Sequence, residues 1–200
     1  MARAAPYDRD ATLDAAMSLF WERGYHATSL KDLEAALSMK PGSIYAAFKS
    51  KENLYLLAME RYTNRFRALF REQIADAPSP LQGLADHLHS FAALPDEHAA
   101  RQACMLVKTI VATQTTEPAI AAQSQAYMSS MRDEFRQVFE AARTRGEISA
   151  DSDCSALARR YQAYVNVLRL EHHQGTDEQE IKALAESLAA EIEALRIREE

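Results

Sequence analysis

Residues 37–54 read LSMKPGSIYAAFKSKENL and carry the most informative pattern of the chain. Pro41 predicts the start of a short helix, because a proline suits the first helical position, where an N–H group would have no partner. Ile44 and Phe48 stand four residues apart and share the face expected to pack against a core. The remaining face carries small, polar and basic side chains, which suit a helix that enters the major groove of DNA.

The residues before this helix predict two further helices. Asp8 or Asp10 can cap the first of them, and Thr28 or Ser29 can cap the second. Asp32 stands where a capping box usually has Glu. Two short helices joined by a tight turn are typical of a helix-turn-helix, in which the second helix of the pair enters the groove.

The same segment resembles the helix-turn-helix of the tetracycline-repressor (TetR/AcrR-like) family. The resemblance is carried by Gly42, Ser43, Ile44, Tyr45, Phe48, Lys51, Glu52 and Leu54, preceded by Gly24, Tyr25, Thr28, Ser29 and Leu33. It implies an all-α chain with a DNA-binding domain at 6–66, whose turn and recognition helix lie at about 29–48. It also implies a helical effector-binding and dimerisation domain at 67–200.

The family resemblance also predicts which residues contact DNA. The expected set is Thr28, Ser29, Lys31, Lys40, Gly42, Ser43, Tyr45, Ala46, Ala47, Lys49 and Lys51. Lys40, Ala46 and Ala47 depart from the residues common in the family. Alanine can meet a thymine methyl group but cannot donate a hydrogen bond, so the operator preference of relatives does not carry over. Tyr45 could instead be a partly buried aromatic residue.

Composition and charge agree with a globular helical protein. Of the 200 residues, 48% are hydrophobic and 26% charged, and only five are Gly and six Pro, which favours helix throughout. The net charge is −6, and residues 1–76 carry 11 Lys and Arg against 10 Asp and Glu. DNA binding is therefore predicted from the placement of the lysines around the short helix, and not from a basic patch.

Periodicity predicts helices for the rest of the chain. A long helix is expected from Lys51 to about residue 75, followed by helices at 81–94, 99–114, 118–145, 153–173 and 177–198. The last two carry wide apolar stripes, which could close the core of one chain or pair with a second copy. The resemblance favours a homodimer formed through these two helices.

An effector pocket is expected in the second domain, because the family binds small molecules there. Phe66, Phe91, Met105, Lys108, Tyr127, Met131, Phe135, Tyr161 and Tyr164 are predicted to line it. Apolar stripes of this kind are more often core than cavity, and the sequence does not identify the effector.

Cys104 supports an alternative, a repressor that senses thiol-reactive or electrophilic molecules. Cys104 lies four residues before Lys108 in CMLVK, and a nearby cation lowers the pKa of a thiol. The segment is similar to one in relatives of the N-ethylmaleimide reductase repressor, although Ala103 replaces the Gly common there. Against this, a free cysteine is more often a small buried hydrophobe.

Other classes of function are not favoured. The chain has no Gly-rich phosphate loop, nucleophile elbow or zinc-protease motif, so we expect no enzyme, cofactor or metal. No apolar run approaches the roughly 20 residues of a membrane span, and two cysteines without a leading apolar segment predict a cytoplasmic protein. The sequence therefore predicts a homodimeric repressor, released from a palindromic double-stranded DNA operator by a small-molecule effector. An activator and a helical interaction protein that does not bind DNA are the alternatives.

Overall fold

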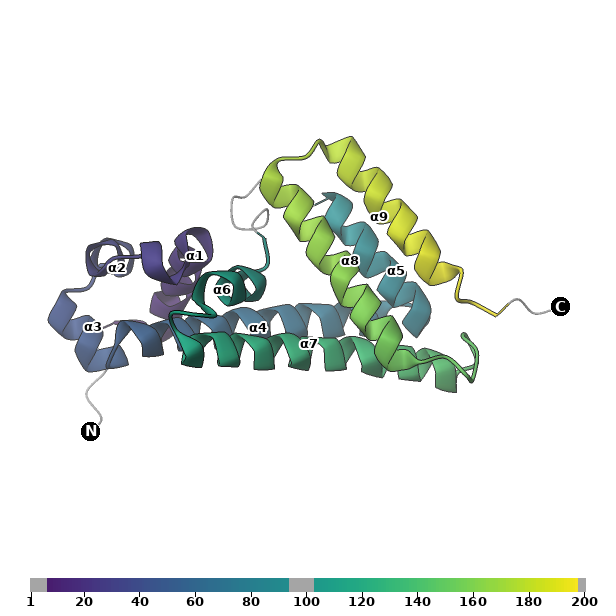
Figure 1. Cartoon of the computed structure of the whole chain (residues 1–200), viewed down its shortest axis with the longest axis horizontal. Coiled ribbons are helices and arrows are strands. Elements are labelled where there is room, and N and C mark those ends of the chain that lie inside the picture. Colours follow the sequence, from purple (N-terminus) through teal and green to yellow (C-terminus); the bar gives the residue numbers. More distant parts are fainter. Residues whose placement is uncertain (1–6, 94–102, 198–200) are drawn as a thin grey trace. The chain divides into compact units, whose positions relative to one another are not determined.

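The computed structural model describes residues 7–93 and 103–197, in which helices account for all regular structure (Figure 1). The all-α prediction is confirmed. Packing divides the chain into two compact units, Met1–Arg65 with Met105–Tyr127 and Phe66–Cys104 with Met128–Glu200. None of the helices in the described ranges combines the length and hydropathy that a bilayer crossing requires.

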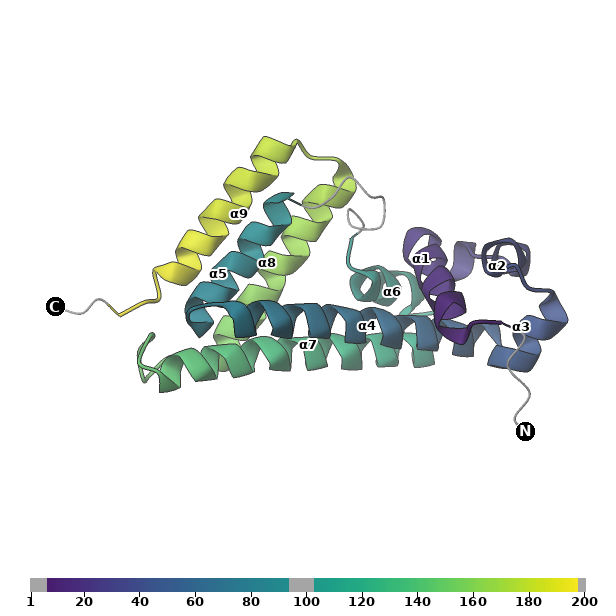
Figure 2. The same ribbon diagram turned by 180° about the vertical axis from the view of Figure 1, so that it is seen from behind.

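The first unit contains the three short N-terminal helices. It is formed by α1 (Arg9–Ala27), α2 (Leu30–Leu37), α3 (Pro41–Phe48), the start of α4 (Lys51–Asp76), α6 (Met105–Thr113) and the start of α7 (Pro118–Thr144). Figure 2 shows α1, α2 and α3 gathered at the N-terminal end of α4. Its fully buried side chains include Phe20, Leu33, Ile44, Phe48 and Leu54, which hold the three short helices on α4.

The helix starts of this unit follow from capping side chains. The Asp8 carboxylate accepts hydrogen bonds from the first N–H groups of α1, at 2.9 and 3.2 Å. Gly24 interrupts α1 with a φ of 80°, a conformation that favours glycine. Ser29 caps α2, and Asp32 returns a hydrogen bond to the N–H of Ser29 at 2.8 Å, so the predicted capping box is present.

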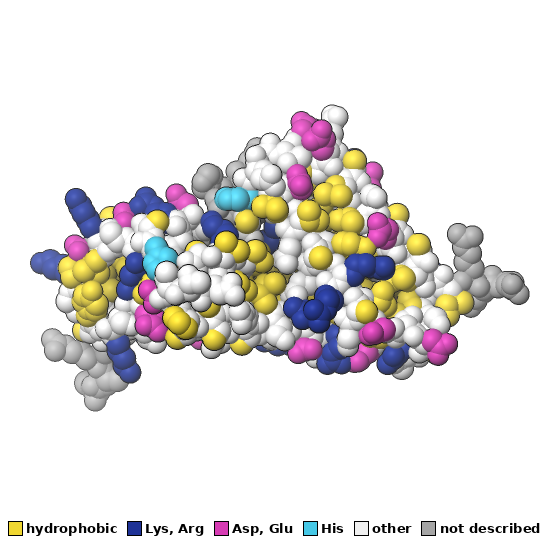
Figure 3. Space-filling view, in the orientation of Figure 1, with side chains coloured by type: hydrophobic (Ala, Val, Ile, Leu, Met, Phe, Trp, Pro, Cys, Tyr) yellow, Lys and Arg dark blue, Asp and Glu magenta, His cyan; other side chains and the backbone are white. Residues whose placement is uncertain are grey.

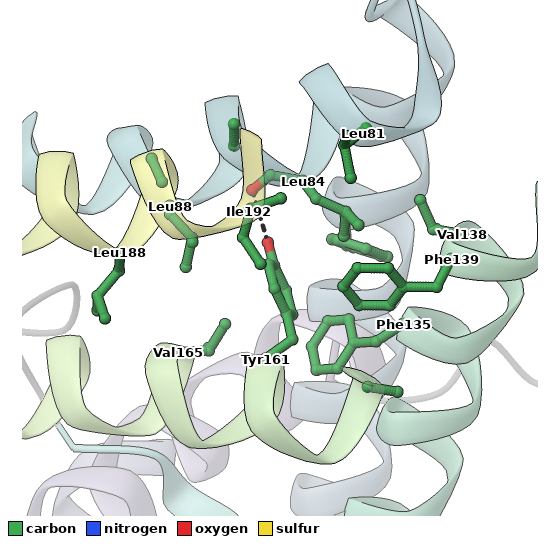
Figure 4. Close-up of a cluster of buried hydrophobic side chains, with 14 of the residues drawn as sticks. Leu81, Leu84, Leu88, Phe135, Val138, Phe139, Tyr161, Val165, Leu188 and Ile192 are labelled. Atoms are coloured by element: carbon green, nitrogen blue, oxygen red, sulfur yellow. Dashed lines mark hydrogen bonds between the residues drawn. The ribbon is translucent and has the colours of Figure 1, made fainter. Parts of the chain in front are cut away.

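The second unit is built around a cluster of apolar and aromatic side chains. It is formed by the rest of α4 and α7 with α5 (Pro80–Ser90), the 3-10 turn η1 (Phe91–Ala93), α8 (Cys154–Gln174) and α9 (Glu178–Glu193). Figure 4 shows Phe135 and Phe139 of α7 beside Tyr161 of α8, with leucines of α5 opposite. The Tyr161 hydroxyl donates a hydrogen bond to the Leu84 carbonyl at 2.9 Å.

Three predicted helix boundaries differ from the structure. The helix expected over 81–94 ends at Ser90 and continues as the η1 turn. The helix expected over 99–114 begins at Met105, after non-helical Ala103 and Cys104, while residues 99–102 lie outside the described ranges. The last helix ends at Glu193, because the chain then turns and the Ile197 N–H donates to the Glu147 carbonyl at 2.9 Å.

Candidate nucleic-acid interface

Helix α3 is fixed to the first unit by its apolar face. Pro41 occupies the first turn, preceded by Lys40 in an extended conformation, as predicted for a proline start. Ile44 and Phe48 are 2% and 1% exposed, so the helix is anchored at both turns. Burying two large apolar side chains contributes on the order of 3–6 kcal/mol, which is enough to orient an eight-residue helix that is too short to be stable alone.

The outward face of α3 combines small side chains with hydroxyl groups. Gly42, Ser43 and Ala46 are exposed, and the Tyr45 side chain is 47% exposed, so its hydroxyl group is open to a partner outside the chain. Ala47 is half-buried. Small side chains let a helix approach base edges closely, while hydroxyl groups can donate to phosphate oxygens.

Lysines lie around this face. Lys31 on α2, Lys40 before α3 and Lys49 after α3 are all exposed. Figure 3 shows Lys and Arg side chains spread around the end of the first unit, with a few acidic side chains among them. Cations at the rim of an inserted helix attract the phosphates on both sides of a groove.

The two residues at the start of α2 have different roles. Ser29 is exposed beside the free N–H groups of the helix, a position that suits a phosphate oxygen. Thr28 is fully buried, and its hydroxyl donates to the Gly24 carbonyl at 2.7 Å. Its side chain therefore serves the α1–α2 junction, contrary to the predicted contact with DNA.

Lys51, which is also predicted to contact DNA, lies against an aromatic ring of its own unit. Its ammonium lies 4.4 Å from the centre of the Tyr25 ring, within the range of a cation–π interaction. Burial lowers the pKa of Lys51, despite the opposing charge of Glu117. Lys51 would have to leave the Tyr25 ring in order to bind a phosphate. The exposed Lys49 is therefore better placed than Lys51 for a phosphate contact.

Arg61, which the sequence did not single out, ties α4 to α1. Its guanidinium donates to both carboxylate oxygens of Asp14, at 2.5 and 2.6 Å, and to Asp10 at 2.9 Å. The hydrogen bond from Arg61 lowers the pKa of Asp14. A bidentate pair of this kind fixes the angle between the helices that carry and support the short α3 helix.

Helix α6 packs on the N-terminal helices, which local sequence patterns did not indicate. The Lys108 ammonium donates to the carbonyls of Trp21 and Glu22 on α1, at 2.7 and 3.2 Å. Burial lowers the pKa of Lys108. A second link joins His26 of α1 to the Thr116 hydroxyl at 2.8 Å. Helix α6 and the turn after it are therefore attached to helix α1 of the same unit.

A buried hydrogen bond also links α6 to α4. The hydroxyls of Tyr55 and Thr109 lie 2.6 Å apart. Since Thr109 donates its own proton to the Met105 carbonyl, Tyr55 is the donor in this pair. Burial raises the pKa of Tyr55, so the hydroxyl keeps its proton.

Tyr55→Phe is expected to lower the free energy of unfolding by about 1 kcal/mol, because the Thr109 oxygen loses a buried donor. Urea unfolding followed by circular dichroism measures the change. Tyr45→Phe is the matched control, since the Tyr45 ring is exposed and its loss of a hydroxyl should leave stability unchanged. Equal effects of the two substitutions would show that the Tyr55 hydroxyl does not stabilise the α6 contact.

The predicted effector residues divide between the two units. Phe66, Phe91, Met131, Phe135, Tyr161 and Tyr164 belong to the second unit, whereas Met105, Lys108 and Tyr127 belong to the first. Phe66, Phe91, Phe135 and Tyr161 all lie around His87, a residue that the sequence did not single out. The sequence did contain a signal that His87 is buried, because it lies three residues after Leu84 and one before Leu88 on a buried stripe.

Cys104 does not pair with Lys108 as predicted. The thiol is 4% exposed and precedes the first residue of α6, while the Lys108 ammonium binds carbonyls of α1. The shared helix face on which the pairing was based is absent, because residue 104 is not helical.

Comparisons with known proteins agree with this geometry. Residues 13–58 match the family model for bacterial regulatory proteins of the tetR family, and residues 80–187 match the tetracyclin repressor-like C-terminal domain. The transcriptional repressor ComR of Escherichia coli is 28% identical over 184 residues, covering 92% of this chain and 88% of ComR.

A solved structure of similar fold contains operator DNA. The TetR family regulator CifR, as a cysteine mutant complexed with 26-bp operator DNA, is 28% identical with a TM-score of 0.83, over 94% of this chain and 98% of CifR. A TetR regulator from Rhodococcus sp. RHA1 is 31% identical with a TM-score of 0.59, over 95% of this chain and all of that one. The helical fold and the matches to both family models show that the chain belongs to the TetR family of DNA-binding transcriptional regulators.

Proposed function

We propose that the chain is a homodimeric repressor that binds a near-palindromic operator through α3 of each subunit and releases it when a small molecule enters the second unit. It acts through binding and not through catalysis. The observation that carries the proposal is α3 itself, anchored by Ile44 and Phe48 and presenting an exposed face of small and hydroxyl-bearing residues within a rim of lysines.

The relatives support the polarity of control and the kind of DNA. ComR is named a repressor, and the CifR structure contains double-stranded operator DNA. A symmetric dimer places two recognition helices on half-sites about one helical turn apart, so each operator should be close to a palindrome.

Helices α8 and α9 are the proposed dimer surface. They pack on the core of the second unit through residues such as Val165 and Ile192, but Leu157, Tyr164 and Leu184 remain partly exposed in the single chain. Leu170 on α8 is 45% exposed. A second copy that covers these side chains would remove apolar surface from water, which is the main driving force of such association.

The effector is proposed to bind in the second unit, which matches the tetracyclin repressor-like C-terminal domain over most of its length. A thiol-based trigger at Cys104 is the less favoured variant of the same function. The Cys104 thiol is buried, and the Lys108 ammonium binds a carbonyl of α1 instead of lying beside the thiol.

Two substitutions, one on α3 and one directly after it, should separate base reading from phosphate attraction. Ala46→Gln is expected to change which bases are preferred at one position of each half-site, since glutamine can bind adenine through two hydrogen bonds. Lys49→Ala is expected to weaken binding to all sequences alike and to reduce the salt dependence by about one phosphate contact.

Fluorescence anisotropy on a panel of single-base operator variants measures both effects. Lys31→Ala serves as a second rim variant and should behave as Lys49→Ala does. If Ala46→Gln lowered the affinity for every operator variant equally, the placement of Ala46 at the base edges would be contradicted.

A further inference from the structure

Arg9, the first residue of α1, lies against the end of α3. Its guanidinium carbon is 5.3 Å from the centre of the Phe48 ring. The Tyr7 ring centre lies 6.1 Å from that of the same ring. Phe48 is the last residue of α3 and is 1% exposed, so these two contacts fasten the start of α1 beside the C-terminal end of α3 (Figure 2). Arg9 therefore belongs to the same end of the first unit as the candidate interface.

The positive charge of Arg9 has no carboxylate partner in residues 7–93 and 103–197. The side chain is exposed, and its contact there is the Phe48 ring. Two other arginines of the unit differ in this respect. Arg23 pairs with Asp32 at 2.6 Å, and Arg61 pairs with the carboxylates of α1. A guanidinium without a carboxylate keeps its five N–H donors for another anion.

The acidic neighbour of Arg9 along the chain is engaged with the backbone. The Asp8 carboxylate accepts hydrogen bonds from the N–H groups of Asp10 and Ala11, at 2.9 and 3.2 Å. Asp8 thus competes with an external anion for the N–H groups that begin α1, but not for the guanidinium. The group at this position that can bind an anion is therefore the Arg9 side chain.

The Phe48 ring places the guanidinium before any partner arrives. A guanidinium can lie over an aromatic ring and still direct its N–H groups to a phosphate, so less conformational freedom is lost on binding. Lys49 follows Phe48 directly and is exposed, while the exposed Lys40 precedes the other end of α3. Both ends of α3 thus carry cations, which suits a helix between the two phosphate backbones of a major groove.

We propose that Arg9 is a further DNA-contacting residue, which binds a backbone phosphate beside the C-terminal end of α3 together with Lys49. The inference rests on the proposed function, because it extends the interface of the same regulator from the helix-turn-helix to the start of α1. The competing explanation is that Arg9 only covers the Phe48 ring. Removal of its charge would then leave the salt dependence of DNA binding unchanged.

Arg9→Gln and Arg9→Lys separate the two explanations. Glutamine removes the charge but keeps a polar side chain over the ring, whereas lysine keeps the charge without the planar group. Fluorescence anisotropy at increasing KCl measures the binding of a mixed-sequence duplex and of a duplex selected by the chain from a random pool. Arg9→Gln should lower the slope of log affinity against log salt by about 0.9 for each bound subunit and weaken both duplexes about ten-fold. Arg9→Lys should keep the slope.

Arg145→Gln is the matched control, because Arg145 is an exposed arginine of the second unit. It changes the net charge equally and should leave the slope unaltered. Circular dichroism establishes that each variant is folded. An unchanged slope for Arg9→Gln, or an equal decrease for Arg9→Gln and Arg145→Gln, would overturn the inference. Failure of Arg9→Gln to fold would also overturn it, because the residue would then be required for structure.

Lys49→Ala on the same duplexes distinguishes failure of this inference from failure of the proposed function. A lower slope for Lys49→Ala but not for Arg9→Gln would reject the contact by Arg9 and leave the regulator standing. If the unaltered chain bound neither duplex at the lowest salt concentration, both would be rejected.

Discussion

Phe48→Ala is expected to lower the free energy of unfolding of the first unit by about 3–5 kcal/mol, the usual cost of removing a fully buried aromatic side chain. The Phe48 ring is 1% exposed, packs 6.1 Å from the Tyr7 ring centre and lies under the Arg9 guanidinium at 5.3 Å. It is one of only two buried anchors of α3. Urea unfolding of the full chain measures the loss.

The same substitution should abolish sequence-specific DNA retention, because α3 is too short to keep its helical form without its anchors. Val111→Ala is the control, since it removes an apolar side chain that is 79% exposed in the same unit. It is expected to change stability by less than about 0.5 kcal/mol and to leave retention intact. Specific retention by Phe48→Ala at the affinity of the unaltered chain would contradict the assignment of α3.

Glu134→Gln is expected to destabilise the second unit by about 2–3 kcal/mol, because it leaves two arginines without their shared carboxylate. Glu134 on α7 is buried, with a side chain 8% exposed, and accepts hydrogen bonds from Nε of Arg67 at 2.9 Å and of Arg71 at 2.7 Å. The estimate lies below that for a fully buried pair, since the Arg71 side chain remains 59% exposed and hydrated.

The effect of Glu134→Gln should depend on pH. Burial by itself raises the pKa of Glu134, but the hydrogen bonds from Arg71 and Arg67 outweigh it, and the net pKa is lower than the ordinary value of 4.5. The stabilisation is therefore complete above pH 4.5 and decreases as the pH falls through the lower pKa of the folded state. Unfolding measured from pH 7 to pH 3 should show the difference between the two proteins shrinking at the acid end.

Asp133→Asn provides the control for this pair. Asp133 is the preceding residue on α7, its side chain is 59% exposed, and its ion pair with Arg136 spans 3.3 Å. No measurable loss of stability is expected, because hydrated surface pairs contribute little. Equal losses from Asp133→Asn and Glu134→Gln would show that burial of the carboxylate is unimportant.

The sequence predicted the helix-turn-helix well because its determinants are local. Pro41 as the start of α3, Ser29 with Asp32 as a capping box, and Ile44 with Phe48 as the buried face all depend on residues a few positions apart. Helical spacing is enough to place such residues relative to one another. The exposed residues of the interface follow from the same pattern.

Local sequence patterns did not predict the contacts between residues far apart in the chain. Lys108 binds carbonyls of Trp21 and Glu22, more than eighty positions earlier, and a backbone acceptor leaves no signal in residue types. Cys104 and Lys108 were placed on one helix face by spacing alone, but the helix begins only after Cys104. Helix ends depend on tertiary contacts, which local propensity does not contain.

The second unit shows the same limit for ligand sites. Helical spacing predicted that Phe66, Phe91, Phe135 and Tyr161 line an effector pocket, which stays a prediction, and it gave no reason to expect His87 between them. The Tyr161 hydroxyl of α8 meets both His87 and the Leu84 carbonyl of α5, and contacts between separate helices leave no pattern in the sequence.

We propose that α3 reads DNA sequence as part of a symmetric dimer. Selection of duplexes from a random-sequence pool by the purified chain, read by sequencing, tests this proposal. We expect enrichment of a near-palindrome with half-sites about one helical turn apart, bound about 1,000-fold or more tightly than scrambled DNA. A pool that stays random after repeated rounds, with the chain folded, would contradict it.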